Sequence, residues 1–438
     1  MSFLRKAALV NSAELVCLGL GVIQTIVLGR VLGPAGVGQY HVIRSALMLT
    51  AQLCCLGFPL SFLYHSQHDP ENTKKYLMNT IWSVLLLGTV AGGVVVLLVL
   101  SKTDYFGLLP RFALVGVGLY VPILLSQLIA RNTLLIRIEA RRLSVIRVLS
   151  VAGGLATILV FYAAGILRVP QALLGLVLAA LTGSFAGWIW AGKYLDPSQK
   201  PSWKTIRRLG SMGIRLGWAD LMILVNAQVN ILIVKYLLTG FEDVGYFSRA
   251  LVIAMLAVVA GQAVLPLLFS QWASLPEQRI PAHVEKVMRF ASTISIIMIF
   301  GILFFGRWMV LLLWGARFLP AVVPMMILVP GAVLYLLSRT LMMLLGSRGA
   351  PELSSLSLLA GIIVNVVLSF LLIPQIGISG AAWASTWSNI VLLLLLAFVV
   401  KKKYKVRLAH CFGLNRSDMA SIMKELRSKA GTDSPPQA

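Results

Sequence analysis

The stretch LGRVLGPAGVGQYHVIRSA, residues 28–46, joins two long apolar segments through a turn rich in glycine and proline. It carries Arg30 at the end of the first segment and Arg44 inside the second. A charged side chain within a membrane span costs a few kcal/mol at minimum, so each one calls for a physical reason. The two arginines that flank this turn are therefore the first candidates for a functional role.

The composition around this stretch is that of a polytopic membrane protein. Of the 438 residues, 58% are hydrophobic and 12% are charged, and the mean hydropathy is +0.88. Soluble domains contain about a quarter charged residues. The first apolar segment is too long for a signal-peptide h-region and lacks a cleavage site, so we expect it to be retained. The net charge of +23 is spread over short loops and one tail, which favours a topology signal over a nucleic-acid-binding patch.

Apolar segments of about 20 residues recur along the chain, and each is long enough to cross a bilayer as a helix. The turn PQIGISG (374–380) separates the last two, and two prolines are expected to interrupt the tenth, as a functional bend or as ordinary packing kinks. The sequence predicts an all-α integral membrane protein with about twelve transmembrane helices. The expected spans are 8–30, 38–63, 78–101, 112–135, 144–166, 170–191, 211–236, 246–270, 288–311, 320–343 (with Pro324 and Pro330), 353–374 and 378–400.

Lysine and arginine are distributed unequally between alternate connections. With the N-terminus placed inside, cytoplasmic segments hold 28 of the 38 basic residues and outer loops hold seven, while Arg44, Arg215 and Lys235 fall within spans. Because cytoplasmic loops are enriched in Lys and Arg, this split predicts that both termini are cytoplasmic.

The longest internal polar connection, GKYLDPSQKPSWKTIRRLG (192–210), follows six spans and precedes six more. Its second part is basic and amphipathic, as expected of a segment that lies on an anionic inner leaflet. The predicted organisation is an N-lobe at 1–195, a cytoplasmic linker at 196–210, a C-lobe at 211–400 and a basic cytoplasmic tail at 401–438, with a short surface helix at 415–429.

The two halves open with the same plan. Each has an acid early in its first span, a cation at the outer end of that span, a Val-Gly turn and an arginine entering the second span. The offset of 205 to 207 residues indicates two parallel six-helix repeats. Transporters built from repeats place their substrate at the interface of the repeats. The matched positions are Glu14 with Asp220, Arg30 with Lys235, Val37-Gly38 with Val244-Gly245, Tyr40 with Tyr246 and Arg44 with Arg249.

The sequence resembles the oligosaccharide flippases of bacterial polysaccharide biosynthesis (the Wzx type), members of the multidrug/oligosaccharidyl-lipid/polysaccharide exporter superfamily. The resemblance covers roughly residues 5–400 and is carried by GRVLGPAGVGQY (29–40), DVGYFSRAL (243–251) and IGISGAAWAS (376–385). Members often carry an aspartate late in the seventh span, where this chain has Val229-Asn230, so the resemblance transfers no acid to that position.

The resemblance implies two six-helix lobes around a central cavity that rock between inward-open and outward-open states. It also implies an undecaprenyl-diphosphate-linked oligosaccharide as cargo, carried from the inner to the outer face of a bacterial cytoplasmic (inner) membrane. The implied partners are membrane lipids and a polysaccharide polymerase with its chain-length machinery, and no nucleic acid. No cofactor is expected, because the sequence has no G-x-x-x-x-G-K-[ST] motif, and its histidines and cysteines lack metal-ligand spacing.

Four repeated cations are the candidate contacts for the diphosphate. Arg44, about 10 Å below the outer surface by helix rise, and Arg249 offer guanidinium forks suited to phosphate oxygens. Arg30 and Lys235 are either further phosphate contacts or interfacial anchors that extend to lipid headgroups. Asn226 and Asn230 are candidate partners for sugar hydroxyls, together with further amides of the spans.

Two acids lie well inside spans, Glu14 and Asp220. They either couple transport to protons or cations, or pair with cations of neighbouring helices; Arg137, Arg141 and Arg339 are the possible partners of Glu14. The basic run RNTLLIRIEARRLSVIR (131–147) is either a topology signal or a positively charged vestibule.

Three other functions compete with the flippase. A cation-coupled multidrug exporter of the same superfamily would need acids in its cavity, and the chain offers two acids against four cations. A membrane polymerase or ligase of polysaccharide assembly would need a catalytic constellation, and the scattered histidines form none. A scaffold without transport would leave the repeated cations unexplained.

Overall fold

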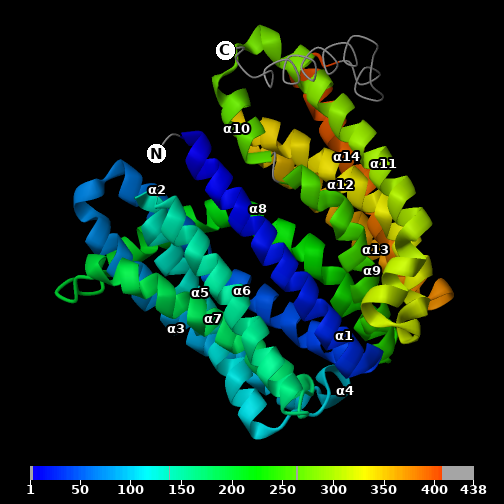
Figure 1. Cartoon of the computed structure of the whole chain (residues 1–438). Helices are drawn as coiled ribbons and strands as arrows, with labels where there is room; N and C mark the ends of the chain where they lie inside the picture. Colours follow the sequence, from blue (N-terminus) through cyan, green and yellow to red (C-terminus); the bar gives the residue numbers. More distant parts are fainter. Residues whose placement is uncertain (1–2, 138, 263–264, 407–438) are drawn as a thin grey trace, which may run out of the picture. The chain divides into compact units, whose positions relative to one another are not determined.

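The computed structural model describes residues 3–137, 139–262 and 265–406, and all regular elements in these residues are helices. The surface helix expected at 415–429 lies outside the described residues. The helices are α1 (Phe3–Cys55), α2 (Phe58–His68), α3 (Thr73–Ser101), α4 (Thr103–Phe106), α5 (Arg111–Ile136), α6 (Ala140–Ala163), α7 (Val169–Ala191), α8 (Trp203–Leu237), α9 (Phe241–Gln262), α10 (Leu265–Ser274), α11 (Ile280–Trp314), α12 (Val322–Ser347), α13 (Pro351–Ile376) and α14 (Ile378–Tyr404), with the 3₁₀ turns η1 (Pro70–Asn72), η2 (Gly192–Tyr194), η3 (Glu277–Arg279) and η4 (Ala316–Ala321) (Figure 1).

The predicted all-α membrane fold class is confirmed. Within the described residues, ten helical stretches are long and apolar enough to cross a membrane. The first of them, Ser12–His68, covers the first two predicted spans, and the eighth predicted span (246–270) falls on α9 and α10. The interruption expected at the two prolines of the tenth span is not found. Helix α12 runs without a break through Pro330, and Pro324 lies in its first turn, where the ring removes no hydrogen bond of the helix interior.

Helix α1 holds two predicted spans in one element. Its 53 residues would extend about 80 Å, well over twice the thickness of the roughly 30 Å hydrocarbon core. Gly33 leaves the helical conformation, with φ 66° and ψ −178°, and Pro34 restarts the helix. The predicted turn is therefore a one-residue kink. The second predicted span (38–63) is also divided, because the backbone breaks at Leu56 and Gly57 between α1 and α2.

The chain forms two compact units. The first comprises the described residues up to Leu251, with Arg307–Met325 and Asn365–Ala384; the second comprises Val252–Gly306, Met326–Val364 and the described residues from Ser385 onward. The predicted lobe boundaries at 196–210 stay a prediction. Residues 203–210, the expected amphipathic segment, form the start of α8, so this segment and the seventh span are one continuous helix.

In the first unit α5 packs against α3 and α7, α7 packs against α6, and α1 packs against α6 and α8 (Figure 1). Small residues allow these close approaches. A Cβ on Gly154 of α6 would lie 2.8 Å from the Cβ of Ala179 in α7, and a Cβ on Gly217 of α8 would lie 2.8 Å from the Cα of Gly57.

The two helical segments that carry the repeated Val-Gly pairs, 34–38 of α1 and 241–245 of α9, pack against each other. A Cβ on Gly38 would overlap the carbonyl oxygen of Phe241 and lie 3.0 Å from the amide nitrogen of Gly245. In return, a Cβ on Gly245 would overlap the carbonyl oxygen of Pro34. The same offset, 207 residues, relates Pro34 to Phe241 and Gly38 to Gly245, so the contact is reciprocal between equivalent positions of the repeat. Only residues without a side chain let two backbones approach this closely.

In the second unit α14 is bonded to its two neighbouring helices. The Thr386 hydroxyl donates to the carbonyl oxygen of Ile327 in α12 at 2.8 Å, and the Ser388 hydroxyl donates to the carbonyl oxygen of Gly361 in α13 at 2.7 Å. A Cβ on Gly331 would lie 2.9 Å from the Cα of Thr386, so α12 and α14 are also in close backbone contact.

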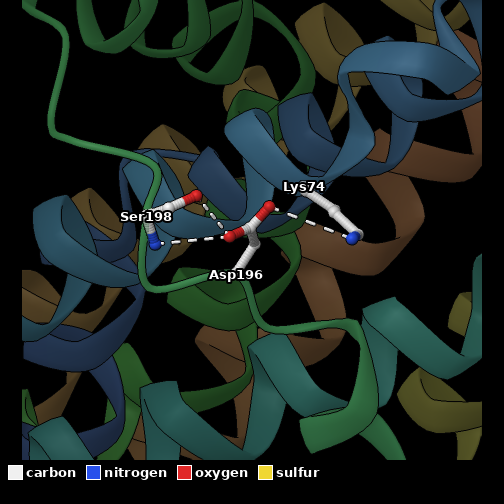
Figure 2. Close-up of polar contacts among 3 residues, drawn as sticks. All are labelled: Lys74, Asp196 and Ser198. Carbon is white, nitrogen blue, oxygen red and sulfur yellow. Dashed lines mark hydrogen bonds and ion pairs between the residues drawn. The ribbon is translucent and has the colours of Figure 1, made fainter.

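Asp196 orders the connection between α7 and α8. Its carboxylate accepts from the Ser198 hydroxyl at 2.6 Å and from the Ser198 amide at 3.3 Å, and it lies 3.9 Å from the Lys74 ammonium at the start of α3 (Figure 2). The hydrogen bond from the Ser198 hydroxyl lowers the pKa of Asp196 below its usual range. The ionised carboxylate is therefore the form that holds the connection.

Filling the reciprocal contact is expected to destabilise the first unit. Gly38→Ala should lower the free energy of unfolding by about 3 kcal/mol, the upper end of the range for overpacking, because backbone atoms must separate. The matched control is Gly93→Ala in α3, where a Cβ meets nothing within 4 Å. Unfolding of both purified variants in detergent measures the difference, and equal stability of the two variants would contradict the contact.

The connection around Asp196 should loosen in acid. Because the folded pKa is below the ordinary value of about 3.9, the stabilisation is present above that value and is lost as pH falls through the folded pKa. Hydrogen exchange of residues 195–202, corrected for the intrinsic pH dependence, should rise over this window in the wild type. In Asp196→Asn it should already be raised at neutral pH; a profile identical to the wild type would exclude the role.

Candidate functional site

Arg44 and Arg249, equivalent positions of the two repeats, line one cavity of the first unit. Its volume is about 330 Å³, and α1, α5, α6, α7 and α9 form its walls. We call it the arginine cavity. No carboxylate is among the described side chains that line it. The polar lining residues are Gln24, Thr25, Tyr40, His41, Arg44, Tyr120, Gln127, Ser150 and Arg249.

Arg249 is the most unusual side chain of the cavity. It is 1% exposed, and none of its three guanidinium nitrogens has a hydrogen-bond partner within the described part of the chain. Its guanidinium lies over the Trp314 ring, 5.2 Å from the centroid. A buried cation is normally paired, and cation–π attraction replaces only part of its lost hydration. The guanidinium of Arg249 therefore has hydrogen-bond donors that an acceptor could still satisfy.

Trp314 is held in place on both sides. Its indole Nε1–H donates to the carbonyl oxygen of Thr25 at 3.0 Å, and its ring packs directly on Gly29 of α1. The tryptophan is 3% exposed. This packing fixes the position of the Arg249 guanidinium above it.

Arg44 presents the second guanidinium. Its Nε is buried without a hydrogen-bond partner among the described residues. Tyr40 and His41 lie about one turn earlier on α1 and line the same cavity, their rings meeting edge to face with centroids 5.4 Å apart. Two arginines that share a cavity without a carboxylate favour an anion with several oxygens, such as a phosphate or diphosphate.

The other two repeated cations contact the backbone. Arg30 donates from Nε to the carbonyl oxygen of Leu313 at 3.1 Å and from Nη2 to that of Leu312 at 2.5 Å. It therefore caps the C-terminal end of α11, whose last carbonyls have no partner in the helix. Lys235 is 3% exposed, donates to the carbonyl oxygen of Thr239, and lies 3.9 Å above the Phe241 ring. Both contacts fit an anchoring role, in which the cation holds backbone carbonyl oxygens at or next to a helix end.

The predicted amides lie outside the lining of the arginine cavity. Asn230 is 4% exposed, and its Oδ1 accepts from the Ser369 hydroxyl at 3.5 Å, so it lies in helix packing. Asn226 is half-buried on α8. Nearby, Gln228 accepts from the Ser45 hydroxyl at 2.8 Å, which ties α8 to α1.

The two predicted acids are in different surroundings. Glu14 pairs with Arg147 of α6, so none of the three partners considered from the sequence is the observed one. Asp220 lines a second cavity of the first unit, about 360 Å³, together with Gln52, Arg131 and Asn132. This cavity brings one arginine of the basic run 131–147 opposite an acid of α8. Its lining contains a carboxylate, a guanidinium and amides, whereas the described lining of the arginine cavity contains no carboxylate.

Several residues of the site escaped sequence reasoning. Trp314 follows a long apolar span and gives no local signal, since an aromatic residue at a span end usually marks the membrane interface. Tyr40 and His41 lie inside the quoted stretch, and the spacing of His41 three residues before Arg44 could have placed both on one helix face.

The buried, unpaired charge should lower stability. Arg249→Met replaces it by an apolar side chain of similar length and should raise the free energy of unfolding by about 1–3 kcal/mol in phosphate-free buffer. The matched control Arg30→Met removes a helix cap and should lower it by about 1 kcal/mol. Denaturant unfolding in detergent gives both values; a destabilised Arg249→Met protein would show that Arg249 serves the fold.

Comparison with known proteins places the chain in a family. The family model for polysaccharide biosynthesis protein matches residues 3–272. The protein named probable low-salt glycan biosynthesis flippase Agl15 of Haloferax volcanii is 25% identical over 260 residues, which cover 57% of this chain and 52% of that protein. The chain thus matches about half the length of this curated relative.

Solved structures share the fold. The lipid II flippase MurJ in an inward closed conformation superposes with a TM-score of 0.75 at 14% identity, covering 98% of this chain and 94% of that one. An inward-facing multidrug resistance MATE family transporter of the MOP superfamily gives 0.67 at 15% identity, covering 88% and 94%. At such identities the likeness shows the fold alone. The resemblance drawn from the short glycine motifs is confirmed: the chain belongs to the polysaccharide biosynthesis protein family and has the fold of MOP-superfamily transporters.

Proposed function

We propose that the protein is a flippase that moves an undecaprenyl-diphosphate-linked oligosaccharide from the inner to the outer face of the membrane by alternating access. The observation that carries the proposal is the arginine cavity, in which Arg44 and Arg249 face one space and Arg249 has no partner for its three nitrogens. The family of the chain and the glycan flippase among its relatives support the same cargo class.

The chemistry of a lipid diphosphate fits this cavity. Moving its negative charges through a bilayer is unfavourable because hydration is lost. Two guanidinium groups replace part of that hydration with charge-assisted hydrogen bonds, and each can hold two oxygens in its planar fork. Tyr40, His41 and Gln127 offer uncharged polar groups beside them. The prenyl chain stays in the lipid, where it needs no protein contact.

The remaining parts of the proposal come from the sequence: the Lys/Arg pattern predicts the position of the termini, and the resemblance to Wzx-type flippases implies the membrane, the direction and the partners. The protein lies in a bacterial cytoplasmic membrane with both termini in the cytoplasm. It receives cargo built on the cytoplasmic face and delivers it on the other side, where a polysaccharide polymerase and its chain-length machinery act on it. Glu14, which pairs with Arg147, and Asp220, which lines the second cavity, are the two candidates for coupling to an ion.

A cation-coupled multidrug exporter is the alternative that the fold allows, because MATE transporters share it. The charges of the arginine cavity disfavour this alternative. A cationic drug would meet two guanidinium groups and no carboxylate among the described lining residues. Drug efflux by the wild type without any glycan transport would establish the exporter.

Complementation tests the flippase. In a host that lacks its own oligosaccharide flippase, the wild type should restore surface polysaccharide. Arg44→Ala and Arg249→Ala should each reduce it at least about tenfold at equal membrane abundance, since each loses a charge-assisted contact with the diphosphate. The exposed Arg307→Ala is the matched control and should behave as wild type.

The outcomes separate function from site. Restoration by all variants would keep the flippase and discard the arginine cavity. Failure of the wild type in hosts with several different glycans, together with drug efflux, would overturn the proposal.

A further inference from the structure

The second unit contains a cavity of a different character. Its volume is about 370 Å³, and its walls come from α9, α10, α11 and α12. Apolar side chains form most of the lining, among them Leu265, Leu268, Phe290 and Ile294. Gln271, His283 and Lys286 line one end, and the hydroxyl residues Ser295 and Thr340 also belong to the lining. We call it the α11 cavity.

The α11 cavity is amphipathic along the axis of α11. Residues 283, 286, 287, 290, 291, 294 and 295 line it, the spacing of one helix face. The cation and the histidine come first, and apolar residues follow. From Lys286 to Ile294 the helix rises about 12 Å, which is less than half of the roughly 30 Å hydrocarbon core. The cavity therefore has the length of one leaflet, with its polar end at the start of the helix.

The polar end offers hydrogen-bond donors to an anion. The buried Trp272 donates from its indole Nε1–H to His283 Nδ1 at 2.9 Å. An Nδ1 that accepts carries no proton, so the proton of the neutral ring is on Nε2, which is left to donate. Lys286 is exposed and charged, and no carboxylate is among the described side chains of the lining.

From this arrangement we infer that the α11 cavity binds one chain of an anionic glycerophospholipid, with the lipid phosphate held by Lys286 and His283. The charge of the polar end selects an anionic headgroup, and the apolar face of α11 receives the chain. The volume is at the small end of the roughly 300–1,000 Å³ of ligand cavities, which suits a headgroup with part of a chain and excludes a whole lipid-linked glycan. The site is separate from the proposed transport cavity and does not rest on that proposal.

Ser295 supplies an internal control for the type of occupant. It lines the cavity eight residues beyond Val287, is 1% exposed, and its hydroxyl has no partner among the described residues. An acyl chain has no polar atom to offer this hydroxyl. Its removal should therefore leave lipid binding unchanged, whereas a polar ligand that fills the depth of the cavity would lose a contact.

Binding of defined lipids to the purified full-length protein tests the inference. Native mass spectrometry with dioleoyl phosphatidylglycerol and dioleoyl phosphatidylcholine should show at least about tenfold tighter binding of the anionic lipid, and Lys286→Met should abolish this preference, as the loss of one charge-assisted contact predicts. Ser295→Ala should bind as wild type. Arg279→Ala, which removes an exposed cation near the same end of α11 but outside the lining, should also bind as wild type.

Other results would overturn the inference. Equal binding of both lipids by the wild type would leave an apolar groove without recognition of the phosphate. An equal loss in Arg279→Ala and Lys286→Met would reduce the effect to general surface charge. Loss in Ser295→Ala would indicate a polar occupant, and displacement of phosphatidylglycerol by a polyprenyl phosphate at lower concentration would assign the cavity to that carrier lipid.

Discussion

The reciprocal approach of two helical segments, 34–38 of α1 and 241–245 of α9, is the constraint on which the rest of the first unit depends. Gly38 lies against the backbone of Phe241, and Gly245 lies against the backbone of Pro34. Because backbones and not flexible side chains meet, the relative position of the two helical segments has little freedom. Arg44 follows its glycine by six residues and Arg249 by four, about 9 Å and 6 Å along their helices. A fixed contact between the two segments thus directs both arginines to one cavity.

We propose two different roles for the four repeated cations. Arg30 and Lys235 contact carbonyl oxygens at the ends of helices and stabilise the fold. Arg44 and Arg249 have buried guanidinium nitrogens without hydrogen-bond partners among the described residues. The Arg249 guanidinium lies over the Trp314 ring. Keeping an unpaired guanidinium in a buried position lowers stability and prepares a strong site for an anion. Each pair of equivalent positions thus has one role: Arg30 and Lys235 serve the fold, and Arg44 and Arg249 are proposed to serve transport.

Hydropathy and the Lys/Arg pattern predicted the fold class because a bilayer requires long apolar helices whatever their packing. The repeat was also visible, since Val37-Gly38 and Val244-Gly245 keep the same register. Details that depend on a single backbone angle were not predictable. Within α1 only Gly33 has a non-helical conformation, and this residue makes the kink. The same glycine-rich sequence is equally compatible with a longer turn.

Contacts between segments that are distant in sequence could not be predicted either. Glu14 could reach several arginines along the chain, and only the packing of α1 on α6 selects Arg147. The sequence could not show that Arg30 and Arg44 have different contacts. Arg30 binds the end of α11, which lies about 280 residues away in sequence. Trp314 and His41 were not predicted as site residues for the same reason: their role depends on which distant segments pack against them.

The most direct test of the central claim is a double-mutant cycle on binding of a lipid diphosphate. Affinities of the purified protein for undecaprenyl diphosphate and undecaprenyl monophosphate would be measured for wild type, Arg44→Ala, Arg249→Ala and the double variant. If both guanidinium groups hold one diphosphate, the wild type prefers the diphosphate, and the two substitutions are coupled by at least about 1 kcal/mol. Additive effects with no preference between the two lipids would contradict the account, because the arginines would then act separately and not as one site.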